Sequence, residues 1–200
     1  MKSPLLIAAL LGLLAGAVVA VVLVVNPQIG SAPSPSSSGK ALVGGPFALS
    51  GPAGKRVTEK DFAGRPMLVY FGFTHCPDIC PSGLQVISAA LDKLGPGAAK
   101  IATLFITLDP ERDSPAVMGE YVKSFHPAIV GLTGTLDEVV AAAKAYRVYF
   151  KKVADEATPG NYSVDHSAFM YLMNGQGEYV KHFPHSAGVD ELASALSAQP

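Results

Sequence analysis

The chain has few cysteines and almost no excess charge of either sign. Only two of its 200 residues are cysteines, and its formal net charge at pH 7 is -1. This near-neutral balance excludes the basic footprint of a nucleic-acid-binding protein. Because neither cysteine lies near the N-terminus, lipid attachment at a leading cysteine is excluded as well.

Charged side chains are also missing from a long stretch near the N-terminus. Residues 5–25 consist of Leu, Ile, Ala, Gly and Val, and about 21 residues of helix span the ~30 Å hydrocarbon layer. The run is longer than the apolar part of a typical signal peptide and is followed by no clean small-residue cleavage site. We therefore predict a membrane anchor at residues 1–26 with a single transmembrane helix, and a cleaved signal peptide is the alternative.

The charges that flank this stretch predict its orientation. Lys2 and the amino terminus are positive, and no further charge appears before Lys40. Positive flanks stay on the cytoplasmic side, so we expect the rest of the chain in the periplasm, tethered to the inner membrane, or in the mitochondrial intermembrane space if the source is eukaryotic. Residues 27–40 form a Pro/Ser-rich linker, and residues 41–200 have the length of one domain.

Apolar runs and amphipathic segments alternate along residues 41–200. They predict strands at 67–73, 100–108, 167–173 and 178–183, helices at 82–94, 114–125, 135–146 and 190–197, a short hairpin at 47–57 and a helical turn at 58–62. A helical crossover makes the first two core strands parallel, and the last two form an antiparallel hairpin. The predicted fold class is α/β, a mixed central sheet flanked by helices, with chemistry expected at the carboxyl end of the first core strand.

Both cysteines, Cys76 and Cys80, follow that strand directly. A purely structural disulfide is a weak explanation, because a domain of this size folds without one and the loop it would close is short. On a helix, residues four apart share one face, so the two sulfurs can hold one metal ion or form a disulfide. Thiol redox enzymes more often use the shorter Cys-x-x-Cys spacing, which favours the metal.

Two sulfurs need a third ligand, and the five histidines are the candidates. His166 lies in a polar loop, residues 162–167, before an apolar strand that can neighbour the strand leading to Cys76. Asp165 can orient its ring, and an ordinary loop histidine capped by Asp165 is the alternative. The remaining four are expected at positions without a metal role: His75, His126, His182 and His185.

Two thiolates and one imidazole form a soft-to-borderline ligand set. Structural zinc usually takes four protein ligands. Cu(I) accepts three ligands rich in sulfur, and Cu(II) accepts a tetragonal site with one exogenous position. The ligand chemistry therefore favours copper over zinc.

Three segments together resemble the SCO/SenC family of copper proteins: Tyr70–Pro81, Ile106–Pro115 and Asp165–Ser167. The likeness extends over essentially all of residues 41–200. Members of that family are membrane-tethered, thioredoxin-fold factors that assemble the dinuclear copper centre of cytochrome c oxidase. The resemblance implies a thioredoxin-like fold and a site for Cu(I) or Cu(II) whose ligands are Cys76, Cys80 and His166. Asp109 and Asp113 fall on the family's acidic motif, and their roles stay open: support of the site, docking, or plain turn residues.

The main functional hypothesis is a membrane-tethered copper metallochaperone. It takes copper from an upstream donor and delivers it to the copper-accepting subunit of cytochrome c oxidase. The alternatives are a thiol-disulfide oxidoreductase, in which Cys76 and Cys80 act as the redox pair that reduces the acceptor cysteines, and a copper or redox sensor.

Overall fold

The computed structural model describes residues 42–154 and 161–200. These residues belong to one compact unit, Ala41–Pro200. The predicted anchor at 1–26 and the linker at 27–40 lie outside the described residues. Within the described part of the chain, no helix combines the length and the apolar character that crossing a membrane requires.

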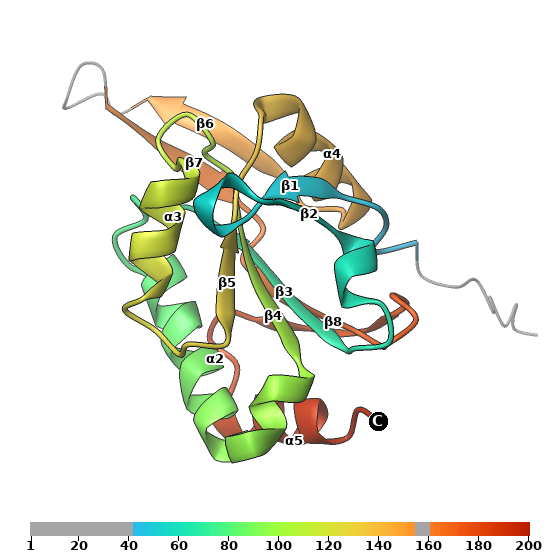
Figure 1. Ribbon diagram of the computed structural model, residues 1–200. Coiled ribbons are helices and arrows are strands. Elements are labelled where there is room, and N and C mark those ends of the chain that lie inside the picture. The colour runs from blue at the N-terminus through green and yellow to red at the C-terminus, as the bar shows by residue number, and fades with distance from the viewer. Residues whose placement is uncertain (1–41, 155–160) are drawn as a thin grey trace, which may run out of the picture. The chain divides into compact units, whose positions relative to one another are not determined.

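A five-stranded mixed sheet forms the centre of the unit (Figure 1). Its strands, in spatial order, are β5 (Ile129–Leu132), β4 (Ala102–Thr107), β3 (Met67–Gly72), β8 (Phe169–Met173) and β9 (Tyr179–Pro184). The pairs β3–β4 and β4–β5 are parallel, whereas β3–β8 and β8–β9 are antiparallel. The predicted α/β class, the parallel first pair and the closing hairpin are confirmed.

Strands β3 and β4 are buried along their whole length, as expected for apolar runs covered by helices on both faces. Adjacent residues of β3 point to opposite faces. Tyr70 lies against Gly83 of α2 (Ile79–Leu94), where an added Cβ would come within 2.6 Å of the Tyr70 hydroxyl. Phe71 packs on Tyr146, which follows α4 (Leu136–Ala145), with ring centroids 5.4 Å apart. Helices α2 and α4 therefore cover opposite faces.

Local capping signals mark where two helices begin. Helix α3 (Pro115–Val122) follows Ser114, whose hydroxyl accepts a hydrogen bond from the backbone of Val117 at 3.3 Å. Helix α4 follows Thr135, which forms the predicted capping box with Glu138. Such a cap stabilises a helix by about 1 kcal/mol.

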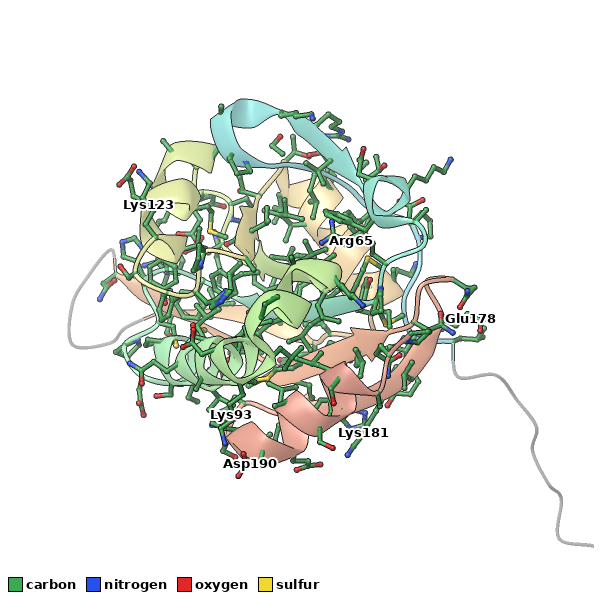
Figure 2. The ribbon with its side chains drawn as sticks, turned by 60° about the horizontal axis from the view of Figure 1, so that its bottom comes forward. Arg65, Lys93, Lys123, Glu178, Lys181 and Asp190 are labelled. Carbon is green, nitrogen blue, oxygen red and sulfur yellow. The ribbon has the colours of Figure 1, made fainter. Side chains whose placement is uncertain are left out.

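Helix α5 (Val189–Ser197) lies beside α2. Figure 2 shows Lys93 of α2 directed at Asp190 of α5, with which it forms an ion pair, and Lys181 of β9 on the same side of the molecule. Lys181 pairs with Glu191 at 2.7 Å. Exposed ion pairs of this kind contribute little, so the packing of α5 rests on its buried apolar residues, Leu192, Ala193 and Leu196.

Two small sheets and three 3₁₀ segments complete the described part of the fold. Strands β1 (Ala48–Ser50) and β2 (Arg56–Thr58) form the predicted hairpin, and the predicted helical turn is η3 (Glu59–Phe62). The other 3₁₀ segments are η2 (Pro52–Gly54) and η4 (Gly95–Lys100), the latter directly after α2. A separate antiparallel sheet pairs β6 (Phe150–Ala154) with β7 (Tyr162–His166).

The structure corrects the sequence prediction at several elements. Strands β5, β6 and β7 were not predicted, and the segment interpreted as a polar loop before β8 is β7 itself. Helix α2 begins three residues before the predicted start at Ser82, and α3 ends at Val122 rather than Phe125. The missed strands are short or largely exposed, so they carry little of the apolar pattern that identifies a strand.

Candidate metal centre

Three segments meet beyond the carboxyl ends of β3 and β4. They are the loop 73–78 after β3, the loop 108–114 after β4, and the end of β7. A cavity of about 400 Å³ opens between the first and third of these, lined by residues that include Cys76 and His166. This is the edge of a parallel β-α-β unit at which ligands are expected to bind.

The two cysteines occupy different environments. Cys80 is the second residue of α2 and is completely buried, whereas Cys76 is partly exposed and lies in the loop ahead of the helix. The expectation that both sit on one helical face is therefore wrong for Cys76. The backbone N–H of Cys80 nevertheless donates to the Cys76 sulfur at 3.4 Å, so the loop brings the sulfur to the helix N-terminus. Both thiols are free.

Gly72, the last residue of β3, leaves room for the Cys80 sulfur. A Cβ at this position would lie 2.7 Å from Cys80 Sγ and 2.8 Å from Phe105 Cε2. Contacts this short do not occur between real side chains, so a larger residue at position 72 would displace the sulfur. The absence of a side chain at the end of β3 thus fixes where Cys80 can sit.

The pKa values of the two thiols are shifted in opposite directions. The Cys80 thiol donates a hydrogen bond to Cys76, and together with the Cys80 amide this lowers the pKa of Cys76 to about 5 despite partial burial. The same hydrogen bond, followed by burial, raises the pKa of Cys80 above its usual range. The lowered pKa of Cys76 favours its thiolate at neutral pH, which is the form that attacks disulfides and binds metals.

Strand β7 ends at His166 and places its ring beside Cys80. Its Nε2 lies 3.9 Å from Cys80 Sγ, and its Nδ1 lies 3.0 Å from the carbonyl oxygen of Val164. In the neutral imidazole whose Nδ1–H donates to that carbonyl, the lone pair is on Nε2, the nitrogen that faces the Cys80 sulfur. The Phe73 ring stands nearly perpendicular to the imidazole, with centroids 5.8 Å apart. A backbone carbonyl thus orients the ring, in the place expected for Asp165.

The separation between Cys80 and His166 suits a shared metal ion. Sulfur and nitrogen ligands at ~2.3 and ~2.0 Å from one ion, with tetrahedral or trigonal angles, are about 3.5–3.7 Å apart. The 3.9 Å between Sγ and Nε2 is close to this value. No group of three or more His, Cys, Asp or Glu side chains in residues 42–154 and 161–200 has the full arrangement of a metal site. The donor atoms of Cys76, Cys80 and His166 and their placement fit a soft metal ion. The three side chains do not yet have the full geometry of a three-ligand site.

Three of the other histidines contact groups other than the sulfurs. His75 is exposed, and its Nδ1 lies 3.1 Å from the hydroxyl of Thr74. His126 accepts a hydrogen bond from the backbone of Ala128 at 3.1 Å, a local turn contact. His182 lies on β9, where its ring packs against Phe169 with centroids 5.0 Å apart.

Asp109 and Asp113 are both completely buried, so an exposed docking role is wrong for their side chains. Their hydrogen-bond partners include Thr74, Thr107 and Tyr162. The sequence analysis missed these threonine and tyrosine partners. The available signal was the placement of two acidic residues directly after a buried strand, at the edge where the cysteine loop also begins.

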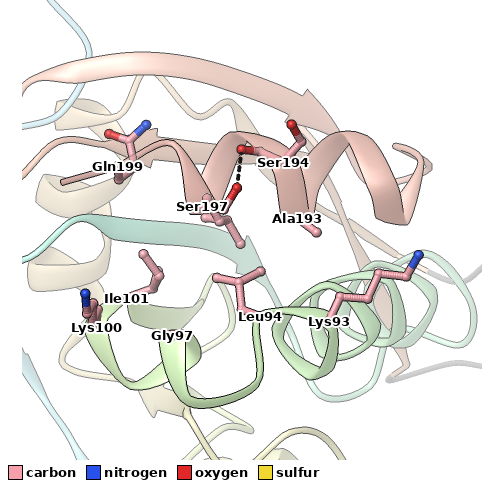
Figure 3. A pocket seen from close by; sticks show the side chains of 10 residues that line it. Lys93, Leu94, Gly97, Lys100, Ile101, Ala193, Ser194, Ser197 and Gln199 are labelled. Atoms are coloured by element: carbon pink, nitrogen blue, oxygen red, sulfur yellow. Dashed lines mark hydrogen bonds between the residues drawn. The ribbon is translucent and has the colours of Figure 1, made fainter.

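A second hollow lies at the far end of α2 and carries no comparable chemistry. It measures about 410 Å³ and lies between α5 and the segment from Lys93 to Ile101 (Figure 3). None of the ten described residues that line it is Cys, His, Asp or Glu. Because α2 rises about 1.5 Å per residue, this hollow is roughly 20 Å from the cysteines.

A buried thiol, a neighbouring thiolate and an imidazole at the carboxyl edge of a mixed sheet define the class: an α/β domain built for soft-metal or thiol chemistry. Comparison with known proteins gives the family. The SCO1/SenC family model matches residues 35–199, and this chain belongs to that family.

Individual relatives agree. The mitochondrial SCO1 homolog 1 of Arabidopsis thaliana is 46% identical over 161 residues, 80% of this chain and 48% of that protein. The human mitochondrial SCO1 homolog is 43% identical over 164 residues, 80% of this chain and 53% of that protein. The chain thus spans about half the length of the curated relatives it matches.

Solved structures of copper-bound proteins share the fold. ScoI of Bradyrhizobium japonicum with copper bound has a TM-score of 0.74 and 43% identity, covering 79% of this chain and 99% of that one. Yeast Sco1 with copper bound has a TM-score of 0.68 and 43% identity, covering 79% of this chain and 90% of that one. The mixed sheet with flanking helices is therefore the Sco arrangement, consistent with the predicted thioredoxin-like fold.

Proposed function

We propose that this chain is a copper metallochaperone that binds one copper ion through Cys76, Cys80 and His166. Its cargo is delivered to the copper-accepting subunit of cytochrome c oxidase, for the dinuclear copper site. The observation that carries the proposal is the approach of His166 Nε2 to within 3.9 Å of Cys80 Sγ, beside the thiolate of Cys76. Copper-bound structures of relatives with the same fold support it.

The donor set explains the choice of metal. One thiolate is already present at neutral pH, and the second forms when Cys80 gives up its proton as the ion binds. With one imidazole these sulfurs suit Cu(I) in a three-ligand site, and Cu(II) with one further ligand from outside the protein. Nδ1 of His166 is held by the Val164 carbonyl, so Nε2 is the atom that contacts the ion.

The position of the site suits release as well as capture. Cys76 is partly exposed on a loop, and the cavity beside it is open to an incoming chain. During transfer, each new bond from copper to an acceptor thiolate or imidazole forms as one bond to Cys76, Cys80 or His166 breaks. No electrons need to move in this exchange.

The N-terminal residues complete the proposal. We place residues 1–26 in the membrane as an anchor and residues 27–40 as the linker that holds the copper-binding domain, 41–200, above the bilayer. The domain then faces the periplasm, or the intermembrane space in a mitochondrion, where it meets an upstream copper donor. Tethering raises the concentration of the donor near a membrane-bound acceptor.

Copper transfer to an acceptor tests the function directly. The full chain, loaded with one equivalent of Cu(I), is mixed with the soluble copper-binding domain of the oxidase subunit, and the metal content of each protein is measured after separation. The proposal expects one equivalent bound and movement of copper to the acceptor. The matched control is His182→Ala, which removes a histidine remote from the sulfurs. Retention of all copper on the donor chain would contradict the chaperone role.

The low pKa of Cys76 favours a second candidate, reduction of disulfides. The Cys76 thiolate attacks a partner disulfide to form a mixed disulfide. Cys80 then loses its proton and attacks Cys76, and the partner leaves as a dithiol while Cys76 and Cys80 end as a disulfide. Metal-free chain added to the oxidised acceptor domain tests this: stoichiometric formation of acceptor thiols supports it, and their absence rules it out.

A further inference from the structure

We propose that Asp109 and Asp113 are positioning residues that hold the two halves of the copper site in register. Asp113 fixes the loop that carries Cys76, and Asp109 fixes the hairpin that carries His166. Both carboxylates belong to one loop, residues 108–114, after β4. The inference rests on the proposed function and assigns a role to side chains that do not contact the cargo.

The hydrogen bonds of the Asp113 carboxylate go to the cysteine loop and to the end of β4. Its Oδ2 accepts from the backbone N–H of Thr74 at 3.0 Å and from the hydroxyl of Thr107 at 2.6 Å, and its Oδ1 accepts from the hydroxyl of Thr74 at 2.5 Å. Thr74 lies two residues before Cys76, within the turn closed by the Cys76 N–H and the Phe73 carbonyl at 3.3 Å. The carboxylate therefore anchors the turn that presents the Cys76 sulfur.

The contacts of Asp109 reach the other half of the site. Its Oδ1 accepts from the hydroxyl of Tyr162 on β7 at 2.8 Å, and its Oδ2 pairs with Arg112. Arg112 also donates to the Tyr162 carbonyl at 3.1 Å, and its guanidinium lies 3.8 Å from the Tyr162 ring centroid. Lys152 of β6 lies 4.7 Å from the same ring and pairs with Glu111 at 2.5 Å. Tyr162 is thus held at its hydroxyl, its ring and its carbonyl.

Tyr162 controls His166 because both lie on one face of β7. Side chains two and four positions apart in a strand point the same way, so Tyr162, the buried Val164 and His166 face inward, while Ser163 and Asp165 are exposed. The β6–β7 hairpin is not part of the five-stranded sheet. Anchoring one end of this inward face fixes the depth and rotation at which His166 approaches Cys80.

The loop between the two carboxylates is itself rigid. The backbone N–H of Asp113 donates to the carbonyl of Asp109 at 2.9 Å, and the N–H of Asp109 donates to the hydroxyl of Thr107 at 2.9 Å. The hydroxyl of Thr133, after β5, donates to the Asp113 carbonyl at 2.6 Å. Both carboxylates therefore extend from one fixed stretch of backbone. That stretch sets the distance between the loop that carries Cys76 and the hairpin that carries His166.

Two mild substitutions separate the anchors. Tyr162→Phe removes the hydroxyl that donates to Asp109, and Thr74→Val removes one hydroxyl that donates to Asp113. The matched control is Tyr146→Phe, which removes a buried hydroxyl with no hydrogen-bond partner among the described residues. Each change is made in the full chain, alone and together with His166→Ala.

The first readout needs no copper. Hydrogen exchange of the metal-free chain is expected to speed up in β6 and β7 for Tyr162→Phe and in residues 73–78 for Thr74→Val, with β3 and β4 unchanged. Tyr146→Phe is expected to alter neither segment. Exchange in both segments identical to the wild type in both variants would overturn the proposal, whatever the chain does with copper.

The second readout is Cu(I) affinity, measured by competition with a chromophoric chelator. Loss of a residue that supports a ligand typically costs about 10–100-fold in metal affinity, and we expect about 10-fold for each variant. In the His166→Ala background Tyr162→Phe should have no further effect, because it acts through His166, while Thr74→Val should still weaken binding. An equal loss from Tyr162→Phe in both backgrounds would show a general structural role and overturn its assignment.

The two readouts also separate this inference from the proposed function. If the wild type and His166→Ala bound copper with equal affinity, the affinity measurements would show that the proposed copper site is wrong. The exchange arm would still decide whether the two carboxylates hold the loop and the hairpin.

Discussion

His166 Nε2 lies 3.9 Å from Cys80 Sγ, although 86 residues separate the two in the chain. The contact exists because β8, which begins three residues after His166, pairs antiparallel with β3, which leads to the cysteines. The sheet therefore brings an imidazole to the carboxyl end of β3, where the helix N-terminus already holds the sulfurs.

Removing the imidazole should weaken copper binding strongly. We expect His166→Ala to lower Cu(I) affinity by more than about 100-fold, because even the loss of an outer partner of a ligand costs about 10–100-fold. The thiolate-to-Cu(II) charge-transfer bands should also shift. Chelator competition measures the affinity, and His182→Ala, at the remote ring stack with Phe169, serves as the control. Equal affinities in the two variants would remove His166 from the site.

The Cys76 thiolate makes a pH-dependent prediction. Its pKa of about 5 in the folded chain lies below the ordinary thiol value, which is about 8.5. The contribution to stability is therefore fully present above about pH 8.5 and is lost as the pH falls through about 5. Alkylation of the metal-free chain by iodoacetamide should follow one thiolate with a midpoint near pH 5, and Cys76→Ser should abolish it. A midpoint near 8.5 in the wild type would contradict the assignment.

The difference in unfolding free energy between the wild type and Cys76→Ser tests the same group by another route. It should shrink as the pH is lowered from 7 toward 5, because the folded chain then takes up the proton that the unfolded chain already holds. Denaturant unfolding at several pH values measures it. A difference that does not vary with pH would show that the thiolate is not stabilised by folding.

The sequence was sufficient for the core and for the expectation that Cys76, Cys80 and His166 lie close together. The long apolar runs predicted β3 and β4, because strands buried on both faces need no alternating pattern. The position of the cysteines after β3 and the capping box at Thr135 were equally local signals, and the structure places Cys76, Cys80 and His166 together.

The remaining features depend on contacts between distant residues. Strand β5 has only four residues, one of them Gly131, whose added Cβ would come within 3.1 Å of the Met118 carbonyl in α3. The β6–β7 hairpin is mostly exposed, and Tyr162 is fixed by the loop after β4 rather than by its own sequence. From the sequence alone, a buried carboxylate such as Asp109 cannot be told from an ordinary turn residue, because its partner Tyr162 lies in a distant segment.

Filling the space beside Cys80 should harm both folding and the site. Gly72→Ala places a Cβ 2.7 Å from Cys80 Sγ, and overpacking of this kind costs about 1–3 kcal/mol. Copper affinity should fall as well, because the sulfur must move. The control is Gly119→Ala in α3, where an added Cβ meets nothing within 4 Å, and which should raise stability by about 0.5–1 kcal/mol. Wild-type copper affinity in Gly72→Ala would show that the sulfur position is not critical.

The cap of α4 should affect stability alone. Thr135→Ala removes the hydroxyl that accepts from the Glu138 backbone, and the expected loss is about 1 kcal/mol. Thr135→Ser keeps the hydroxyl and should recover most of it. Copper affinity should match the wild type in both variants, since the cap lies outside the segments that carry the ligands. A change in affinity would show coupling that the structure does not explain.

X-ray absorption spectroscopy of the full chain loaded with one equivalent of Cu(I) tests the central claim most directly. We predict two sulfur neighbours and one nitrogen neighbour at the copper, with the nitrogen lost in His166→Ala and kept in His182→Ala. A wild-type spectrum with sulfur neighbours only, unchanged by His166→Ala, would contradict the account.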